Sequence, residues 1–332
     1  MKTQKRRIAV ALALALCLLL GGARAREIDG NEWLGILTEL VQTVGNRQVY
    51  TEGSLRAQEY LMAAFGDMGF SEEDGTLLRQ RFTASDYDDR EVAAGREIVN
   101  IVATKRAASE NAPILVVSAH YDTVGDTLGA KDNGSGVAAM LLLARLFSGM
   151  EAFPDTELQF VAFDAEEVGE FGSHAYLDAM EPEARGRILA CVNIDLITLD
   201  AGAEEIALSC NNLGGRTEDG YEAGFEGYAT HNRATLAFRK AFETLTAFDE
   251  ESEENLVFCI PRHWGDSDHL YFHEYGIDAA TICFQGNVIE GGSWPADMHT
   301  PRDVLKPFDM ERTEHALRVT SRAVLELARD HQ

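Results

Sequence analysis

Histidine and carboxylate side chains follow three short apolar segments of the sequence. One segment ends in His120, the next in the pair Glu166-Glu167 and the third in Asp195. In open α/β sheets, ligands bind at the carboxyl ends of the strands. Imidazole and carboxylate groups suit Zn²⁺. If the three segments are strands of one sheet, these side chains are candidate ligands of a metal centre.

Glu166 and Glu167 are the most informative pair. Adjacent side chains diverge, so one carboxylate can bind a metal while the other holds the water that attacks a substrate. Two neighbouring glutamates on a surface helix usually carry no function. Here they come directly after an apolar segment and before Gly169 and Gly172, which favours a functional interpretation.

Three further residues complete the candidate centre. Asp122 lies two positions after His120, so in extended chain both face the same side, and its carboxylate can fix the tautomer of the imidazole. Asp132 opens the sequence Asp-Asn-Gly-Ser-Gly before an apolar helix, where it would either cap the helix or offer one oxygen to each of two cations. His299 lies in a late loop. Two metal ions about 3.5–4 Å apart are a known hydrolytic arrangement.

The elements that would position these residues alternate along the chain. Strands are predicted at residues 98–104, 114–119, 158–163, 188–195 and 279–284, which are apolar and bounded by turn or polar residues. Helices are predicted at residues 33–44, 55–65, 137–147, 231–245 and 309–329, and two acidic loops at residues 201–227 and 248–255. This alternation indicates an α/β fold whose mixed, mainly parallel sheet is covered by helices on both faces.

The first 25 residues have the layout of a secretory signal peptide. A basic start precedes an uncharged apolar run at residues 8–20 and the small residues Ala23-Arg24-Ala25. The run is short for a membrane span, although an N-terminal anchor is the alternative. We expect residues 26–332 to form one exported domain, which makes the protein secreted or extracytoplasmic, with no stable membrane partner after cleavage.

Composition limits the possible partners. The formal net charge is −26, and removing residues 1–25, which hold five basic and no acidic residues, would make it −31. Such a surface repels nucleic acid. The four cysteines beyond the signal segment form no C-x-x-C pair, so a zinc knuckle is not expected; Cys191 and Cys283 fit a core, and the pairing of Cys191, Cys210, Cys259 and Cys283 is left open.

The chain resembles the co-catalytic zinc aminopeptidases, family 28 of the metallopeptidases, of the bacterial leucyl aminopeptidase type. The matching motifs lie in order between about residues 98 and 303 and are specific as a set: Ser118-Ala119-His120-Tyr121-Asp122-Thr123, Asp132-Asn133-Gly134-Ser135-Gly136, Phe163-Asp164-Ala165-Glu166-Glu167-Val168-Gly169, Gly172-Ser173, Asn193-Ile194-Asp195, Ser267-Asp268-His269 and His299-Thr300-Pro301.

This resemblance implies a three-layer zinc exopeptidase fold, two Zn²⁺ ions and peptide substrates. His120 and Asp195 would bind one zinc, Glu167 and His299 the other, and Asp132 would bridge them, with a cis peptide bond after Asp132. Asp122 would orient His120. Glu166 would be the general base.

The chain departs from the family where a tyrosine often precedes the Ser-Asp-His motif. Residues 262–266 read Arg-His-Trp-Gly-Asp, so His263 or Trp264 would have to polarise the substrate carbonyl. The alternatives to an aminopeptidase are a glutaminyl cyclase-like acyltransferase with one zinc, a carboxypeptidase or dipeptidase of the same fold, and a non-catalytic binding domain. The asparagine after Asp132 and the complete ligand set favour the peptidase. For Asp268-His269 we expect a helix N-cap that supports the site.

Overall fold

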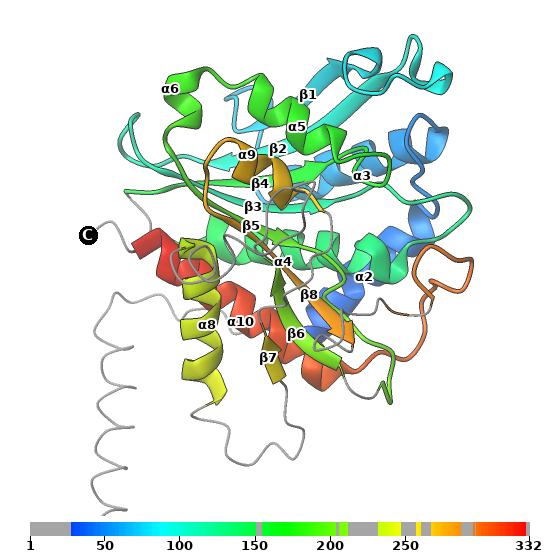
Figure 1. The fold of residues 1–332 in the computed structure, drawn as a ribbon, viewed down its shortest axis with the longest axis vertical. Coiled ribbons are helices and arrows are strands. Elements are labelled where there is room, and N and C mark those ends of the chain that lie inside the picture. The colour runs from blue at the N-terminus through cyan, green and yellow to red at the C-terminus, as the bar shows by residue number, and fades with distance from the viewer. Residues whose placement is uncertain are drawn as a thin grey trace, which may run out of the picture.

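The computed structural model describes residues 28–150, 155–203, 206–211, 232–246, 257–259, 267–286, 295 and 297–329. Within this part of the chain an eight-stranded sheet has the order β1-β2-β4-β3-β5-β8-β6-β7 (Figure 1). The strands are β1 (Leu77–Thr83), β2 (Glu97–Lys105), β3 (Ile114–His120), β4 (Glu157–Phe163), β5 (Ile188–Ile194), β6 (Ile206–Asn211), β7 (Val257–Cys259) and β8 (Ala279–Gly286).

The middle of the sheet is parallel. β3 pairs in parallel with β4 and with β5, and β5 pairs in parallel with β8. Antiparallel pairs join β1 to β2, β2 to β4, and β8 to β6, while β7 is parallel to β6. The carboxyl ends of β4, β3, β5 and β8 therefore meet at one edge. The predicted mixed, mainly parallel sheet is confirmed.

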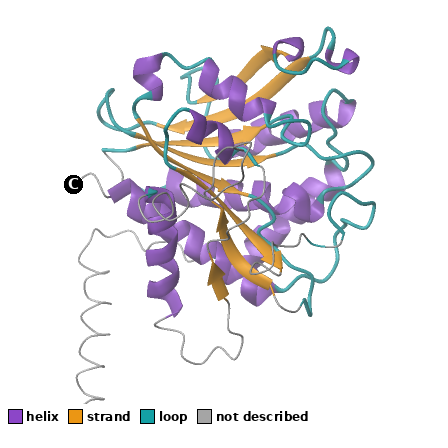
Figure 2. Cartoon of the chain, in the orientation of Figure 1, coloured by secondary structure: helices purple, strands orange, loops and turns teal. Residues whose placement is uncertain are grey.

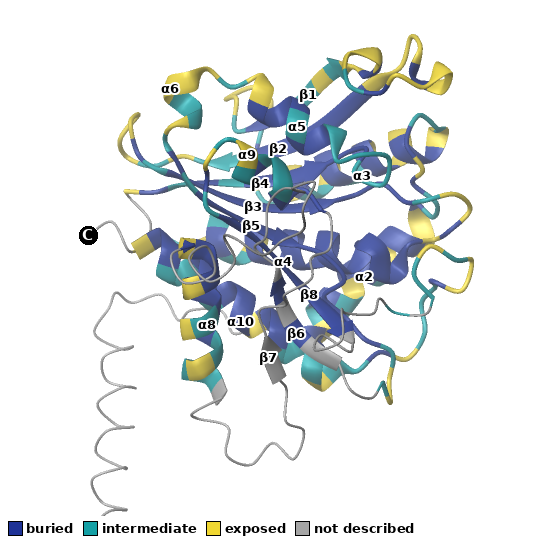
Figure 3. Ribbon diagram, in the orientation of Figure 1, coloured by how far each residue is buried: buried dark blue, intermediate teal, exposed yellow. Residues whose placement is uncertain are grey.

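Helices cover both faces of the sheet (Figure 2). One layer contains α2 (Gly30–Thr43), α3 (Glu52–Asp67), α4 (Gly136–Ser148), α8 (Arg233–Thr246) and α10 (Met310–Arg329), whose apolar side chains share one core with the sheet. On the other face, α5 (Phe171–Asp178) and α9 (His269–Glu274) pack over a second core, and the short α6 (Pro182–Arg185) follows α5. All seven residues of β3 are buried (Figure 3), which explains why its sequence is mostly apolar.

The five predicted strands and five predicted helices are confirmed, with ends that differ by a few residues; β5, for example, ends at Ile194, one residue before Asp195. The prediction of a loop throughout residues 201–227 was wrong. Within that range Ile206–Asn211 forms strand β6, which joins the sheet by pairing with β8. The loop predicted at residues 248–255 lies outside the described residues.

Cys191, Cys210 and Cys283 are buried, so the first and last of these are core residues as predicted. Residues 1–25, the predicted signal segment, also lie outside the described part. Among the helices that the structure describes, none has both the length and the apolar composition of a membrane span.

Candidate metal centre

Three neighbouring strands place four of the predicted site residues at one edge of the sheet. His120 is the last residue of β3, Glu166 and Glu167 follow β4, and Asp195 follows β5. Backbone bonds continue just past these strand ends: the Tyr121 N–H donates to a carbonyl of β4 at 2.8 Å, and the Asp195 N–H donates to a carbonyl of β8 at 3.1 Å. The sheet thereby fixes the spacing of these side chains.

Asp132 lies between two histidines. Its Oδ1 is 3.4 Å from His120 Nε2 and its Oδ2 is 3.0 Å from His299 Nε2. Asp195 Oδ1 approaches His120 Nε2 to 3.5 Å, and Glu167 Oε2 approaches His299 Nε2 to 3.0 Å. The five residues thus form two clusters, each with one histidine and one carboxylate of its own, and Asp132 belongs to both.

The donor atoms fit bound metal ions. Asp132 Oδ2, Glu167 Oε1 and Asp195 Oδ1 are buried and make no hydrogen bond within the described residues. Burying a carboxylate oxygen without a partner is costly unless a cation compensates it. Ligand atoms of His120, Asp132 and Glu167 lie within 4.8 Å of one another, as do those of His120, Glu166 and Asp195. Nitrogen and oxygen donors at this spacing suit Zn²⁺.

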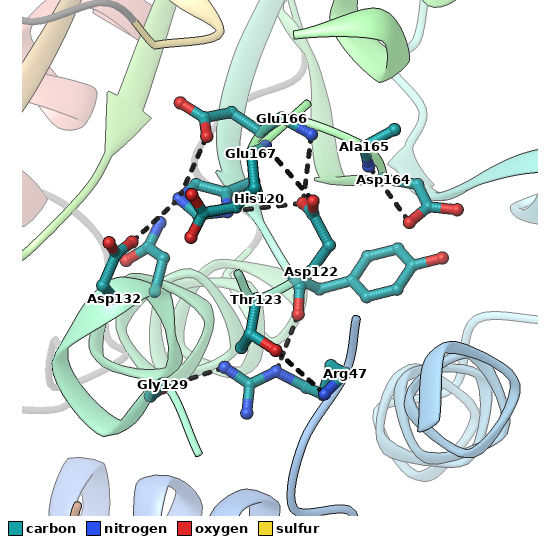
Figure 4. Close-up of polar contacts among 12 residues, drawn as sticks. Arg47, His120, Asp122, Thr123, Gly129, Asp132, Asp164, Ala165, Glu166 and Glu167 are labelled. Atoms are coloured by element: carbon teal, nitrogen blue, oxygen red, sulfur yellow. Dashed lines mark hydrogen bonds and ion pairs between the residues drawn. The ribbon is translucent and has the colours of Figure 1, made fainter. Parts of the chain in front are cut away.

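The Asp122 carboxylate supports both the histidine and the glutamate pair (Figure 4). Its Oδ1 lies 3.4 Å from His120 Nδ1 and accepts from the Glu166 N–H at 3.1 Å, while its Oδ2 accepts from the Glu167 N–H at 3.2 Å. The two glutamates face different histidines, because Glu166 Oε2 lies 3.9 Å from His120 Nε2. One buried carboxylate therefore orients the imidazole and the turn that carries Glu166 and Glu167.

Burial and mutual repulsion set the protonation of the centre. Burial raises the pKa of Glu166 well above its usual value, and burial together with Asp132 raises the pKa of Glu167 to about 7. Asp132 and Glu167 raise the pKa of His299 to about 10. Burial alone would raise the pKa of Asp132, but the two histidines lower it. Without metal, protons therefore partly balance the carboxylates.

Asp132 does not cap α4. It lies in a non-helical turn four residues before the helix begins at Gly136, so the N-cap interpretation was wrong. The peptide bond from Asp132 to Asn133 is cis, as the resemblance implies. The Asn133 side chain donates to the Ile194 carbonyl at 2.8 Å and accepts from the Gly136 N–H at 2.9 Å. A Cβ on Gly136 would lie 2.3 Å from the Ile194 carbonyl oxygen, so glycine permits this close approach.

The Ser267-Asp268-His269 motif lies beside Asp195. Ser267 Oγ donates to Asp195 Oδ2 at 3.1 Å, leaving Oδ1 directed at His120. Asp268 occupies the N-cap position of α9, but its carboxylate makes no capping bond, and burial raises its pKa to about 8. His269 Nδ1 lies 2.7 Å from Thr281 Oγ1 on β8. The supporting role expected for this motif therefore comes from Ser267, whereas the side-chain N-cap was wrong.

Arg47 is a buried cation that the sequence did not indicate. Its guanidinium donates to the carbonyls of Tyr121, Leu128 and Gly129 at 2.7–2.9 Å and to that of Gly45 at 3.1 Å. Burial lowers its pKa to about 10, so it stays charged at neutral pH. Arg47 therefore holds the loop that runs from His120 to Asp132 at both ends (Figure 4).

Replacing Arg47 by methionine is expected to lower the free energy of unfolding by at least about 3 kcal/mol, because several buried carbonyls would each lose a donor at about 1–3 kcal/mol. Urea unfolding of the metal-free protein measures this loss. Arg56→Met is the matched control, since exposed Arg56 donates to no carbonyl other than that of Val44 in the part of the chain that the structure describes. Equal unfolding midpoints for the two variants would contradict the role of Arg47.

Comparison with known proteins agrees with this geometry. Residues 100–324 match the model of peptidase family M28. The chain belongs to peptidase family M28. Aminopeptidase YwaD of Bacillus subtilis is 30% identical over 262 residues, which cover 78% of this chain and 50% of YwaD. Leupeptin-inactivating enzyme 1 of Streptomyces exfoliatus is 29% identical over 153 residues, which cover 46% of this chain and 32% of that enzyme. The M28 chain thus spans at most about half the length of these relatives.

Solved structures share the fold of this M28 chain. A zinc aminopeptidase from Bacillus subtilis superposes with a TM-score of 0.72 at 19% identity, covering 91% of this chain and 96% of the other. Glutaminyl cyclase from Porphyromonas gingivalis superposes with a TM-score of 0.65 at 18% identity, covering 92% and 99%. The three-layer zinc exopeptidase fold is therefore confirmed, and the fold alone does not separate these two activities. Residues 262–266, where the family tyrosine is replaced, lie outside the described residues.

Proposed function

We propose that this chain is a secreted aminopeptidase that uses two zinc ions to hydrolyse peptides from their amino terminus. The observation that carries the proposal is the position of Asp132, which faces His120 with one carboxylate oxygen and His299 with the other. A single-metal enzyme would have no need of the second histidine–carboxylate pair that His299 and Glu167 form.

In this proposal His120 and Asp195 bind one zinc, Glu167 and His299 bind the other, and Asp132 bridges the two. The buried oxygens of these three carboxylates, two of which face the histidines, have no hydrogen bond inside the described residues and support this assignment. Two zinc ions bound there would supply Lewis acidity that polarises the peptide carbonyl and lowers the pKa of water. Asp122 keeps Nε2 of His120 directed at the centre by facing its Nδ1.

Glu166 is the general base of the proposed reaction. It faces the centre but belongs to neither of the two histidine–carboxylate pairs, and burial makes its carboxylate a better proton acceptor. Glu166 takes the proton from the attacking water and returns it to the leaving amine as the peptide bond breaks.

Export through a signal peptide at residues 1–25, followed by a single catalytic domain at residues 26–332, remains part of the proposal. The basic start, the apolar run and the small residues before position 26 support it. One relative, 34% identical over 99 residues, is named a probable lipoprotein aminopeptidase of Mycobacterium tuberculosis, which is consistent with an extracytoplasmic role.

A panel of matched peptides tests the activity. The zinc-loaded enzyme is expected to cleave peptides and amino-acid p-nitroanilides with a free amino terminus, to leave acetylated versions intact, and to stop when a chelator is added. Mass spectrometry of the products identifies the terminus that is cut. Cleavage of acetylated peptides alone would contradict the aminopeptidase, and conversion of amino-terminal glutamine to pyroglutamate without hydrolysis would identify a cyclase instead.

Zinc binding is expected to release at least one proton at pH 7.5 and to weaken as the pH falls. In the metal-free chain the pKa of His299 is about 10, so its imidazole is protonated at this pH and must lose that proton to bind metal. The affinity should therefore rise about tenfold per pH unit towards pH 10 where one proton is displaced. Calorimetric titration in two buffers of different ionisation enthalpy counts the protons; no release at pH 7.5 would contradict this expectation.

A further inference from the structure

Four alternating charges form a network beside His299, which we name the ion-pair latch: Lys131, Asp200, Lys306 and Asp297. Lys131 Nζ lies 3.1 and 3.0 Å from the two carboxylate oxygens of Asp200. Lys306 Nζ lies 2.7 Å from Asp200 Oδ2 and also contacts the Asp297 carboxylate. Lys131 Nζ is 3.9 Å from Asp297 Oδ2, which closes the network.

The side chains of the latch are largely buried. The Lys131 side chain is 1% exposed, Asp297 is 18% exposed and Lys306 is 26% exposed. Ion pairs on an open surface contribute little, whereas a buried ammonium is retained only when carboxylates compensate its charge. Lys131 therefore depends on Asp200, and its pairing orders the segments that carry these two residues.

The latch joins the segments that carry the proposed ligands of one zinc. Lys131 directly precedes the bridging Asp132, and Asp297 lies two residues before His299. Beyond His299, the carboxylate of Asp303 accepts from the backbone N–H groups of Lys131 at 2.8 Å and Asp132 at 3.0 Å. The loop with His299 is thus tied to the turn with Asp132 on both sides of the histidine.

His299 needs this support more than the other proposed ligands do. Its side chain is 45% exposed, whereas that of His120 is 1% exposed. His120 ends a central strand and Asp195 directly follows one, so sheet hydrogen bonds hold them. His299 lies on a turn with a positive φ of 58°, and within the described residues no strand or helix includes it.

We propose that the ion-pair latch positions His299 and thereby sets the zinc affinity of the site formed by His299, Glu167 and Asp132. The site formed by His120, Asp195 and Asp132 keeps its affinity without the latch. This inference rests on the two-zinc centre of the proposed function. Residues that orient a metal ligand without binding the metal themselves typically change metal affinity about 10–100-fold when they are removed.

Asp200→Asn and Lys306→Met test the latch, because both side chains are partly exposed and neither is a proposed metal ligand. Lys240→Met is the matched control, since it removes one lysine from an ion pair with Glu326 that lies on α8 and α10. Each protein is loaded with zinc and dialysed against a graded series of chelator concentrations, and the zinc remaining per chain is measured. Stepwise loading with cobalt follows the second site separately through its absorption spectrum.

We expect the wild type to hold two zinc ions. In both latch variants the zinc at the His299 site should dissociate about 10–100-fold more readily, and in the control its affinity should be unchanged. Lys306→Arg should restore the wild-type affinity, because an arginine can still pair with both carboxylates. Lys306→Met leaves the pair between Lys131 and Asp200 in place. An unfolding midpoint of this metal-free variant equal to that of the control would exclude general destabilisation as the cause.

Two other outcomes would overturn the inference, and they differ. If the wild type and the latch variants both hold two zinc ions with equal affinities, the latch has no positioning role and the two-zinc centre stands. If the wild type holds one zinc at saturation, the two-zinc centre fails and the latch inference fails with it.

Discussion

Glu166→Gln is expected to retain both zinc ions of the proposed centre and to lower the turnover number about 10²–10⁴-fold. Glutamine keeps the size of the side chain but cannot accept a proton from the attacking water. Because Glu166 belongs to neither proposed zinc site, zinc content should match that of the wild type. Steady-state kinetics on an amino-acid p-nitroanilide, together with metal analysis, measure both quantities.

The matched control for this variant is Glu183→Gln, an identical change at an exposed position of α6. The control is expected to have wild-type turnover. Full activity of Glu166→Gln would remove Glu166 from the mechanism, and loss of one zinc from this variant would instead make Glu166 a metal ligand.

Asp132→Asn is expected to weaken the binding of both zinc ions by at least about 100-fold and to abolish activity at ordinary zinc concentrations. Its two oxygens face different histidines, so replacing one oxygen by an amide nitrogen removes the bridging charge from both clusters. Asp195→Asn, the same chemical change at a residue that faces His120 alone, should weaken one zinc only.

Metal content after dialysis distinguishes these two variants. Asp132→Asn should retain no zinc, and Asp195→Asn should retain one zinc per chain. Retention of one zinc by Asp132→Asn would show that Asp132 serves a single metal. Circular dichroism of the metal-free proteins serves as the folding control, since the substituted side chain has nearly the same size and the turn before α4 can still form.

The sequence was sufficient for the central strands and for the candidate residues at their ends. β3, β4 and β5 are apolar because helices cover both faces, and a polar residue directly after such a strand is conspicuous. β1 was missed because it is an edge strand that pairs with β2 alone and exposes Arg79 and Arg81 in part. Its composition therefore resembles that of a loop.

The residues that support the centre were harder to predict than its proposed ligands. Arg47 and Asp303 act through hydrogen bonds with backbone groups, and such bonds impose no pattern on the neighbouring sequence. Lys131 finds its partner Asp200 across 69 positions of the chain, a pairing that only the folded structure reveals. Sequence motifs show chemistry at strand ends, whereas the contacts that hold it in place depend on tertiary packing.

The strand order has a consequence for a chain that is synthesised from its amino terminus. β8 lies between β5 and β6, although it follows both in the sequence. β6 and β7 cannot join the sheet until β8 has emerged, and His299 and Asp303 emerge later still. A nascent chain can therefore build the half of the sheet that carries His120 and Glu167, but it stays without a complete centre until nearly its whole length has been synthesised. The same order of assembly would delay the proposed peptide cleavage until synthesis has passed beyond residue 303.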